Sequence, residues 1–231
     1  MNAQKLSERL AAVASFVPTG STVADIGSDH AYLPCYLIHQ KIATHAIAGE
    51  VVKGPYESAR SQVQQEGLTN QVTVRLADGL QAITPEDQVD TITIAGMGGP
   101  LIASILAKTP SALTNVTRLI LQPNIHARAI REWAMHNGFA ILDEMIMEED
   151  DKIYEVIVLQ RGEMTLTEKQ LLFGPLLSER KAPAFIKKWQ GELAQWHKIL
   201  EAIAQAENTT AMIEKRKELQ YKIEMAEAIL S

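Results

Sequence analysis

The residues best suited to chemistry lie near the N-terminus, around a single glycine. Asp25 lies at the end of an apolar run at 22–26, Gly27 follows this run, and Glu50 ends the next apolar run at 45–50. A strand, a glycine turn, a helix and an acidic residue at the tip of the second strand form the pattern of a nucleotide-ribose site. We therefore expect Glu50 to hold ribose hydroxyls, and Gly27 to let the ligand approach the backbone closely.

The turn departs from the dinucleotide-binding pattern G-x-G-x-x-G, because Asp29 stands where the second glycine would be. A carboxylate at this point repels a pyrophosphate, which disfavours NAD and FAD. A cofactor with a ribose and a cationic tail fits better, and we expect S-adenosylmethionine, with S-adenosylhomocysteine as its product. Asp25 would then lie near the amino-acid end of the cofactor, although an acid at a helix N-terminus has the same pattern.

Two later strand ends are expected to complete the cofactor site. Asp78 and Gly79 follow the apolar run 72–76; the Asp78 carboxylate suits the adenine amino group, and an ordinary Asp-Gly turn is an equally good interpretation. The run 89–95 leads into a glycine-rich loop, 96–99, which lacks the lysine and hydroxyl of a phosphate-binding loop. This loop offers backbone groups and room for a planar base, but no side-chain base. The residues expected to border the cofactor here are Ala95, Gly96 and Met97.

Because that loop carries no acid, Asp29 becomes the candidate catalytic residue. A ring nitrogen of adenine is already nucleophilic and its alkylation gives a cation, so the enzyme has to align the base and stabilise positive charge. The Asp29 carboxylate can do this, or accept a hydrogen bond from the exocyclic amine. Capping the next helix and binding the cofactor ammonium are alternatives that stay open. His30 is expected in the cofactor pocket by its position, and Tyr32 on the substrate side.

Polar and basic residues follow the strand predicted at 118–121. Asn124 and His126 lie just beyond it, and Arg128 and Arg131 come within the next helical turns. We interpret these four side chains as substrate contacts at the mouth of the pocket, with the basic ones on phosphates. A helix cap at Asn124 and a solvated helix face for the others are the plainer alternatives.

The elements that must position these residues alternate along the first 160 residues. Five apolar runs with strand character are separated by helical segments, and a helix at 126–137 precedes two longer β runs at 139–148 and 152–160. Such alternation predicts a parallel sheet with helices on both faces. Two adjacent strands at the end predict a hairpin at the sheet edge. We therefore expect an α/β, Rossmann-like fold of seven strands, with the last one inserted antiparallel.

Helical periodicity marks the C-terminal part of the chain. Apolar residues recur at steps of three and four over 185–206 and again over 212–230, with a polar turn at 208–210 between them. Two heptad-like helices around a polar turn predict an antiparallel coiled-coil hairpin. Its base should dock on the α/β domain, because such a hairpin alone buries little surface.

The change in character after Gly162 predicts a domain boundary. We expect residues 1–162 to form the cofactor-binding domain and residues 163–231 to form a helical domain. Lys187 and Lys188, at the start of the hairpin, are candidate contacts to a folded RNA. Glutamates interleaved with these cations favour a solvated helix face instead.

The bulk composition narrows the class of protein. With 231 residues, 46% hydrophobic residues and a formal net charge of −6, the chain suits one α/β domain with an appendage, and a nucleic-acid partner has to be held by local patches. Cys35 is the only cysteine, which excludes an internal disulfide and a cysteine metal cluster. No apolar run reaches the roughly 20 residues of a membrane span, and no signal-peptide pattern is present. We expect a cytoplasmic monomer without a metal.

Three motifs together resemble one known family. Asp-Ile-Gly-Ser-Asp-His-Ala-Tyr-Leu-Pro at 25–34, Ile-Ala-Gly-Met-Gly-Gly at 94–99 and Leu-Ile-Leu-Gln-Pro-Asn at 119–124 are similar to the bacterial tRNA (adenine-N1)-methyltransferases that act on adenine 22. The similarity spans nearly the whole chain, including Gly-Pro-Leu-Leu at 174–177. It implies a class I methyltransferase domain with a C-terminal coiled coil that makes 1-methyladenosine in the D arm of tRNA. It also implies that the family's acidic motif residue is Asp29.

Two other classes of function stay open on the sequence. A methyltransferase acting on another RNA or on a small molecule would share the cofactor loop, but a small-molecule enzyme is not expected to carry a cationic helical hairpin. A noncatalytic RNA-binding or scaffold protein would keep a degenerate version of the fold.

Overall fold

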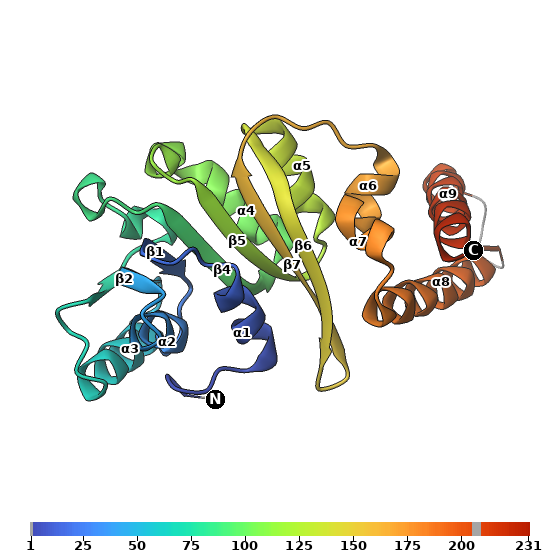
Figure 1. Ribbon diagram of the computed structural model, residues 1–231. Coiled ribbons are helices and arrows are strands. Elements are labelled where there is room, and N and C mark those ends of the chain that lie inside the picture. Colours follow the sequence, from blue (N-terminus) through green and yellow to red (C-terminus); the bar gives the residue numbers. More distant parts are fainter. Residues whose placement is uncertain (1, 205–208) are drawn as a thin grey trace.

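The computed structural model describes residues 2–204 and 209–231 (Figure 1). Within these residues, seven strands form one sheet in the order β3-β2-β1-β4-β5-β7-β6. The strands are β1 Ser21–Ile26, β2 Ala43–Glu50, β3 Val72–Leu76, β4 Thr91–Gly98, β5 Arg118–Ile125, β6 Phe139–Glu149 and β7 Lys152–Arg161. β1 to β5 pair in parallel, whereas β7 is antiparallel to both of its neighbours, β5 and β6. The predicted Rossmann-like sheet with an antiparallel final strand is confirmed.

Helices cover both faces of this sheet, as Figure 1 shows. The first three pack on one face, and the next two pack on the other. Their bounds are α1 Glu8–Ser15, α2 Tyr32–His39, α3 Lys53–Gln65, α4 Gly99–Lys108 and α5 Arg128–His136. Three single 3₁₀ turns, η1 Gly79–Ala82, η2 Pro85–Asp87 and η3 Pro110–Leu113, lie in the connections.

The central strands supply both cores, because successive side chains point to opposite faces. In β1, Val23 joins the core under α1 to α3, while Ala24 joins the core under α4 and α5. In β5, Ile120 faces the first core, and Leu119 and Leu121 face the second. Strands buried on both faces are expected to have continuous apolar sequences, which is how these segments were recognisable.

Two predicted boundaries differ from the observed ones at the carboxyl end of the sheet. β4 and β5 pair beyond the predicted ends, out to Gly98 and Ile125, with irregular register past Ala95. The helix expected from His126 begins at Arg128, because the backbone of His126 is left-handed at φ +57°. The glycine-rich segment is therefore the end of a strand rather than a free loop.

The C-terminal part contains α6 Glu168–Phe173, α7 Pro175–Arg180, α8 Pro183–Ala204 and α9 Thr210–Leu230. These helices share a third core built on Phe173, Phe185 and Trp189, which Ile146 of β6 also joins. The C-terminal helices therefore dock on the sheet through β6 (Figure 1). The two expected long helices are confirmed, whereas their coiled-coil geometry and the boundary at residue 162 stay predictions. Asn208, in the predicted turn, lies outside the described residues.

Cys35 is completely buried in α2, and burial raises the pKa of its thiol to about 12. The thiol therefore behaves as a core group, as expected. In the part of the chain that the structure describes, no helix has the length and apolar character needed to cross a membrane. The same residues contain no group of three or more His, Cys, Asp or Glu side chains placed to hold a metal ion.

Candidate active site at the carboxyl ends of the strands

Gly27 begins the tight turn that connects β1 to α2, next to Gly49 of β2 and Met97 of β4. Its backbone is left-handed at φ +73°, and its N–H donates to the Gly49 carbonyl at 2.9 Å. A Cβ at this position would overlap the Met97 methyl group. Only glycine fits such a conformation and such a close approach, which is the reason for the single glycine of the motif.

Asp25 lies beneath this turn and is only 4% exposed. Its two carboxylate oxygens accept hydrogen bonds from Ser28 Oγ and Thr93 Oγ1, both at 2.6 Å. Burial raises the pKa of Asp25, and these hydroxyl donors act in the opposite direction. Asp25 therefore ties the turn to β4 and orders the ligand-facing backbone.

Glu50 ends β2 and is 6% exposed. One of its carboxylate oxygens accepts the backbone N–H of Asp29. Burial raises the pKa of Glu50, while the hydrogen bond from Asp29 lowers it. Glu50 thus holds the position of the Asp29 backbone and still has a second oxygen for a ligand hydroxyl.

Asp29 has a left-handed backbone at φ +54° and a side chain that is 70% exposed. The imidazole Nε2 of His30 lies 3.8 Å from its carboxylate, and the His30 ring stacks on Tyr32 with centroids 5.2 Å apart. Asp29 is not the N-cap of α2: that position is Ala31, which has no capping side chain. The helix-cap alternative is therefore wrong, and most of the Asp29 side chain is exposed.

A polar network joins the tips of β4 and β5. Gln122 is completely buried, and its Oε1 accepts the Gly96 N–H at 3.0 Å and Arg9 Nη1 at 2.5 Å. Asn124 Nδ2 donates to the Gly96 carbonyl at 2.8 Å, and Gln122 Nε2 donates to Asn124 Oδ1 at 3.2 Å. Both the N–H and the carbonyl of Gly96 are therefore hydrogen-bonded within the protein.

Arg9 reaches this network from α1, 113 residues earlier in the chain than Gln122. Its guanidinium lies over the Tyr154 ring, 5.4 Å from the centroid. The Glu149 carboxylate accepts the backbone N–H groups of Glu8 and Arg9 at 2.5 and 3.3 Å, which fixes α1 against β6. Arg9 and Gln122 were missed from the sequence; the one available signal was an amide side chain within an apolar strand.

The third strand end is placed as expected. Asp78 follows β3 and forms an ion pair with Lys108 of α4, and both side chains are about half exposed. Gly79 has a left-handed backbone at φ +56° and begins η1. The role of Asp78 on an adenine ring stays a prediction.

The prediction for Arg131 is wrong. Its side chain is completely buried, with Nε donating to Glu144 Oε1 at 2.8 Å and Nη2 donating to Glu155 Oε2 at 2.7 Å. A guanidinium enclosed by two carboxylates cannot contact a phosphate at the pocket mouth. The guanidinium is also closely packed against the connection between α6 and α7, because a Cβ at Gly174 would lie 2.6 Å from Arg131 Nη2.

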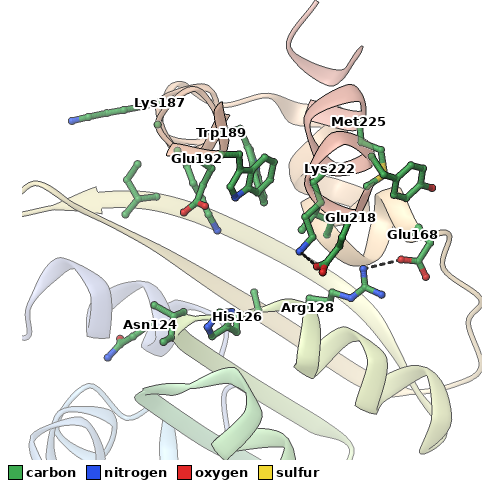
Figure 2. A pocket seen from close by; sticks show the side chains of 18 of the residues that line it. Asn124, His126, Arg128, Glu168, Lys187, Trp189, Glu192, Glu218, Lys222 and Met225 are labelled. Carbon is green, nitrogen blue, oxygen red and sulfur yellow. Dashed lines mark hydrogen bonds and ion pairs between the residues drawn. The ribbon is translucent and has the colours of Figure 1, made fainter. Parts of the chain in front are cut away.

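The other predicted substrate contacts, apart from Tyr32, line a cleft beside the end of β5 (Figure 2). Tyr32 packs against the first core instead. Asn124 and His126 are exposed at the end of β5. Arg128 pairs with Glu132 at 2.7 Å and Glu168 at 2.8 Å. Lys187 and Lys188 pair with glutamates of β6 and β7, Glu148 and Glu155 respectively.

The residues at the strand tips fit S-adenosylmethionine. Glu50 offers a carboxylate to ribose hydroxyls, and Gly27 leaves the backbone open to close approach. Asp25, Asp29 and Glu50 make the local field negative, which suits a sulfonium cation and opposes a pyrophosphate. The residues that would hold the cofactor are therefore those of the first motif and the β2 tip.

A Rossmann-like sheet with an antiparallel β7 and an acidic residue at the end of β2 is the arrangement of a class I S-adenosylmethionine-dependent methyltransferase. The model of the tRNA (adenine(22)-N(1))-methyltransferase family matches residues 23–228. The Bacillus subtilis tRNA (adenine(22)-N(1))-methyltransferase is 46% identical over all of this chain and 99% of its own length. The chain therefore belongs to the tRNA (adenine(22)-N(1))-methyltransferase family.

Solved structures agree with this assignment. The B. subtilis tRNA methyltransferase TrmK has a TM-score of 0.94 and 45% identity, over 99% of this chain and 100% of that one. The Streptococcus pneumoniae protein Sp1610 in complex with S-adenosyl-L-methionine has a TM-score of 0.90 and 44% identity, over 98% of this chain and 100% of that one. The family resemblance read from the three motifs is confirmed.

Proposed function

We propose that the carboxyl ends of β1, β2, β4 and β5 form the active site of this methyltransferase, with Asp29 as the catalytic residue. The reaction is methylation of N1 of adenine 22 in tRNA, with S-adenosylmethionine as the cofactor. The observation that supports the site is the hydrogen bond from the Asp29 N–H to Glu50. It connects the predicted ribose-binding carboxylate directly to the backbone of the predicted catalytic residue.

On the cofactor side, Glu50 would accept hydrogen bonds from the ribose, and Asp78, which follows β3 and pairs with Lys108, would accept from the adenine amino group. When bound, the cofactor supplies an electrophilic methyl group. Gly27 allows close approach, and Asp25 holds the turn through Ser28. His30, Gly79, Ala95, Gly96 and Met97 complete the border of this proposed site.

On the base side, Asp29 provides negative charge. Adenine N1 attacks with its own lone pair, so no proton has to be removed first, and the product base is cationic. The Asp29 carboxylate is exposed and, among the described residues, has no lysine or arginine partner. It is therefore free to stabilise the developing positive charge or to accept a hydrogen bond from the exocyclic amine.

The end of β4 supports this assignment because it offers no acidic or basic side chain. Gly96, Met97 and Gly98 carry no ionisable side chain, and the two Gly96 backbone groups are occupied by Gln122 and Asn124. The network around Gln122 positions this surface without itself supplying an acid or a base. Asp29 is then the nearest candidate for the charged role.

On the RNA side, we propose that Tyr32, Asn124, His126 and Arg128 border the entrance for tRNA, and that Lys187 and Lys188 flank it from α8. Since tRNA is the substrate, we place the enzyme in the cytoplasm and expect it to act as a monomer. Removal of residues 163–231 should abolish tRNA methylation; a truncated protein that still methylates free nucleoside at the full rate would favour a small-molecule enzyme.

The experiment compares the unmodified protein with Asp29→Asn, a change that keeps the left-handed backbone accessible. The unmodified protein should produce 1-methyladenosine at position 22 of total tRNA, as mapped by mass spectrometry. In single-turnover reactions, Asp29→Asn should lower the methyl-transfer rate about 10²- to 10³-fold, as for loss of one preorganised electrostatic group. The control is Glu179→Gln, an exposed carboxylate on α7. An unchanged rate for Asp29→Asn, with cofactor affinity intact, would remove Asp29 from catalysis.

A further inference from the structure

A cleft of about 930 Å³ separates the sheet from the C-terminal helices (Figure 2). Its floor is the segment 124–128 at the end of β5, and its walls come from the β6–β7 hairpin, α8 and α9. The lining side chains include Asn124, Trp189, Trp196, Tyr221, Lys222 and Met225. In Figure 2, Trp189 and Met225 come from the two helices, on the opposite side of the view from Asn124 and His126.

The cations around this cleft are already neutralised. Arg128 pairs with Glu168 at 2.8 Å, and Lys222 pairs with Glu218 on the same helix. Lys187 and Lys188 are paired with strand glutamates. Phosphate binding would have to break these pairs, so the RNA backbone is not the ligand that the cleft favours.

Aromatic surface is what the cleft offers instead. Trp189 is fixed in the third core, edge-on to Phe173 with centroids 4.4 Å apart. Trp196 lies 6.0 Å from Trp189 and is half-buried, and Tyr221 of α9 is 51% exposed. Trp189 itself is only 3% exposed, and its buried Nε1 has no hydrogen-bond partner among the described residues. Rigid aromatic groups with a polar atom are the usual platform for an unstacked nucleobase.

The cleft is continuous with the reaction site. Asn124 lines the cleft and also donates to the Gly96 carbonyl at the strand tips. A polynucleotide with one base at the strand tips can therefore extend past Asn124 toward the cleft. A base-binding surface at this place would select a substrate whose flanking nucleotide is also unstacked.

We propose that the cleft is a second nucleobase site, which takes the unstacked base of a nucleotide flanking the target adenine and stacks it on Tyr221 and Trp196. The inference depends on the proposed function, because it names a further part of the same substrate. It predicts that recognition extends to the conformation of the neighbouring nucleotide and not only to the methylated adenine.

The test uses the full chain with Tyr221→Ala, Tyr221→Phe and the matched control Ile213→Ala. Ile213 is exposed on the same helix and does not line the cleft. Tyr221→Ala should weaken binding of intact tRNA about 5- to 100-fold, the range for loss of one base–aromatic stack. Tyr221→Phe keeps the ring and should bind much more tightly than Tyr221→Ala. Cofactor affinity should be the same in all variants.

The second part of the test uses synthetic tRNAs that lack the base on the 5′ or the 3′ side of the target adenine. On one of them, the unmodified protein and Tyr221→Ala should bind equally well, because the stacking partner is absent. Equal losses on all three tRNAs, or wild-type binding by Tyr221→Ala, would overturn the base site. A dimer in sedimentation that Tyr221→Ala dissociates would show that a second copy covers the cleft. Failure of the unmodified protein to methylate intact tRNA would overturn the proposed function as well.

Discussion

Two regions of the molecule bury carboxylates, and they compensate the negative charge in different ways. At the strand tips, Asp25 and Glu50 accept hydrogen bonds from hydroxyl and backbone N–H groups, and within the described residues neither pairs with lysine or arginine. At the junction between the sheet and the C-terminal helices, Glu144 and Glu155 enclose Arg131. The first region leaves one oxygen of Glu50 available to a ligand, and the second uses its carboxylates to join two parts of the chain.

The pKa shifts of these four carboxylates depend on the cations that each one contacts. Burial raises the pKa of Asp25 and of Glu50. Burial also acts to raise the pKa of Glu155, but Lys188 and Arg131 outweigh it and hold the pKa below the ordinary range. Glu144, which shares Arg131, keeps a pKa raised by burial. At this junction, Glu155 contacts two cations and Glu144 contacts one, and only the charged form of Glu155 is favoured by folding.

The largest effect is expected at the junction. Arg131→Met should lower the free energy of unfolding by about 3–5 kcal/mol, because two buried carboxylates lose their shared cation. Urea denaturation measures this change. The control is Arg128→Met, three residues earlier on α5, where exposed pairs should contribute at most about 1 kcal/mol. If both variants lost a similar free energy of unfolding, the buried cluster around Arg131 would contribute no more to stability than the exposed pairs of Arg128.

A smaller effect is expected at the strand tips, with opposite signs for binding and stability. Glu50→Gln should weaken cofactor binding by about 1.5–3 kcal/mol in calorimetry, since charged hydrogen bonds to the ligand are lost. Its free energy of unfolding at neutral pH should rise, because folding disfavours the ionised Glu50.

The pH dependence separates this explanation from a general change in packing. A group whose pKa is raised by folding contributes stability below its unfolded pKa and loses it as the pH rises through the folded pKa. The stability advantage of Glu50→Gln should therefore shrink as the pH is lowered through the raised pKa. A constant difference at all pH values would contradict the electrostatic account.

The smallest of these effects is expected at Arg9. Arg9→Met removes one charged hydrogen bond to Gln122, whose amide still accepts the Gly96 N–H. We expect kcat on tRNA to fall by about 5- to 30-fold, roughly 1–2 kcal/mol, with little change in cofactor affinity. Arg9→Lys should restore part of the rate by keeping the charge. Loss of cofactor affinity equal to the loss in kcat would mean that Arg9 acts on the whole fold.

The sequence was sufficient for the parts of the site that depend on local pattern. Asp25, Gly27 and Glu50 were placed correctly because a strand end, a glycine turn and the next strand end are fixed by short-range spacing. The antiparallel hairpin was predictable for the same reason, since two adjacent β runs with a short acidic turn have few other arrangements.

Arg131 and Arg9 show where that reasoning stops. The partners of Arg131 lie 13 and 24 residues further on, and Gln122 lies 113 residues beyond Arg9. Helical spacing puts Arg128 and Arg131 on one face, yet only the first lies at the surface. A buried ion pair of this kind depends on tertiary packing, which the periodicity of one element does not contain.

The left-handed backbone at Asp29 also limits which mutations this position can accept over evolution. Glycine and asparagine tolerate φ near +54°, whereas β-branched and most longer side chains are disfavoured there by steric contact with the backbone. A glutamate would keep the charge but meet the same steric cost, and it would move the carboxylate outward by one methylene. The range of viable replacements is therefore restricted by conformation before any selection for chemistry acts on it.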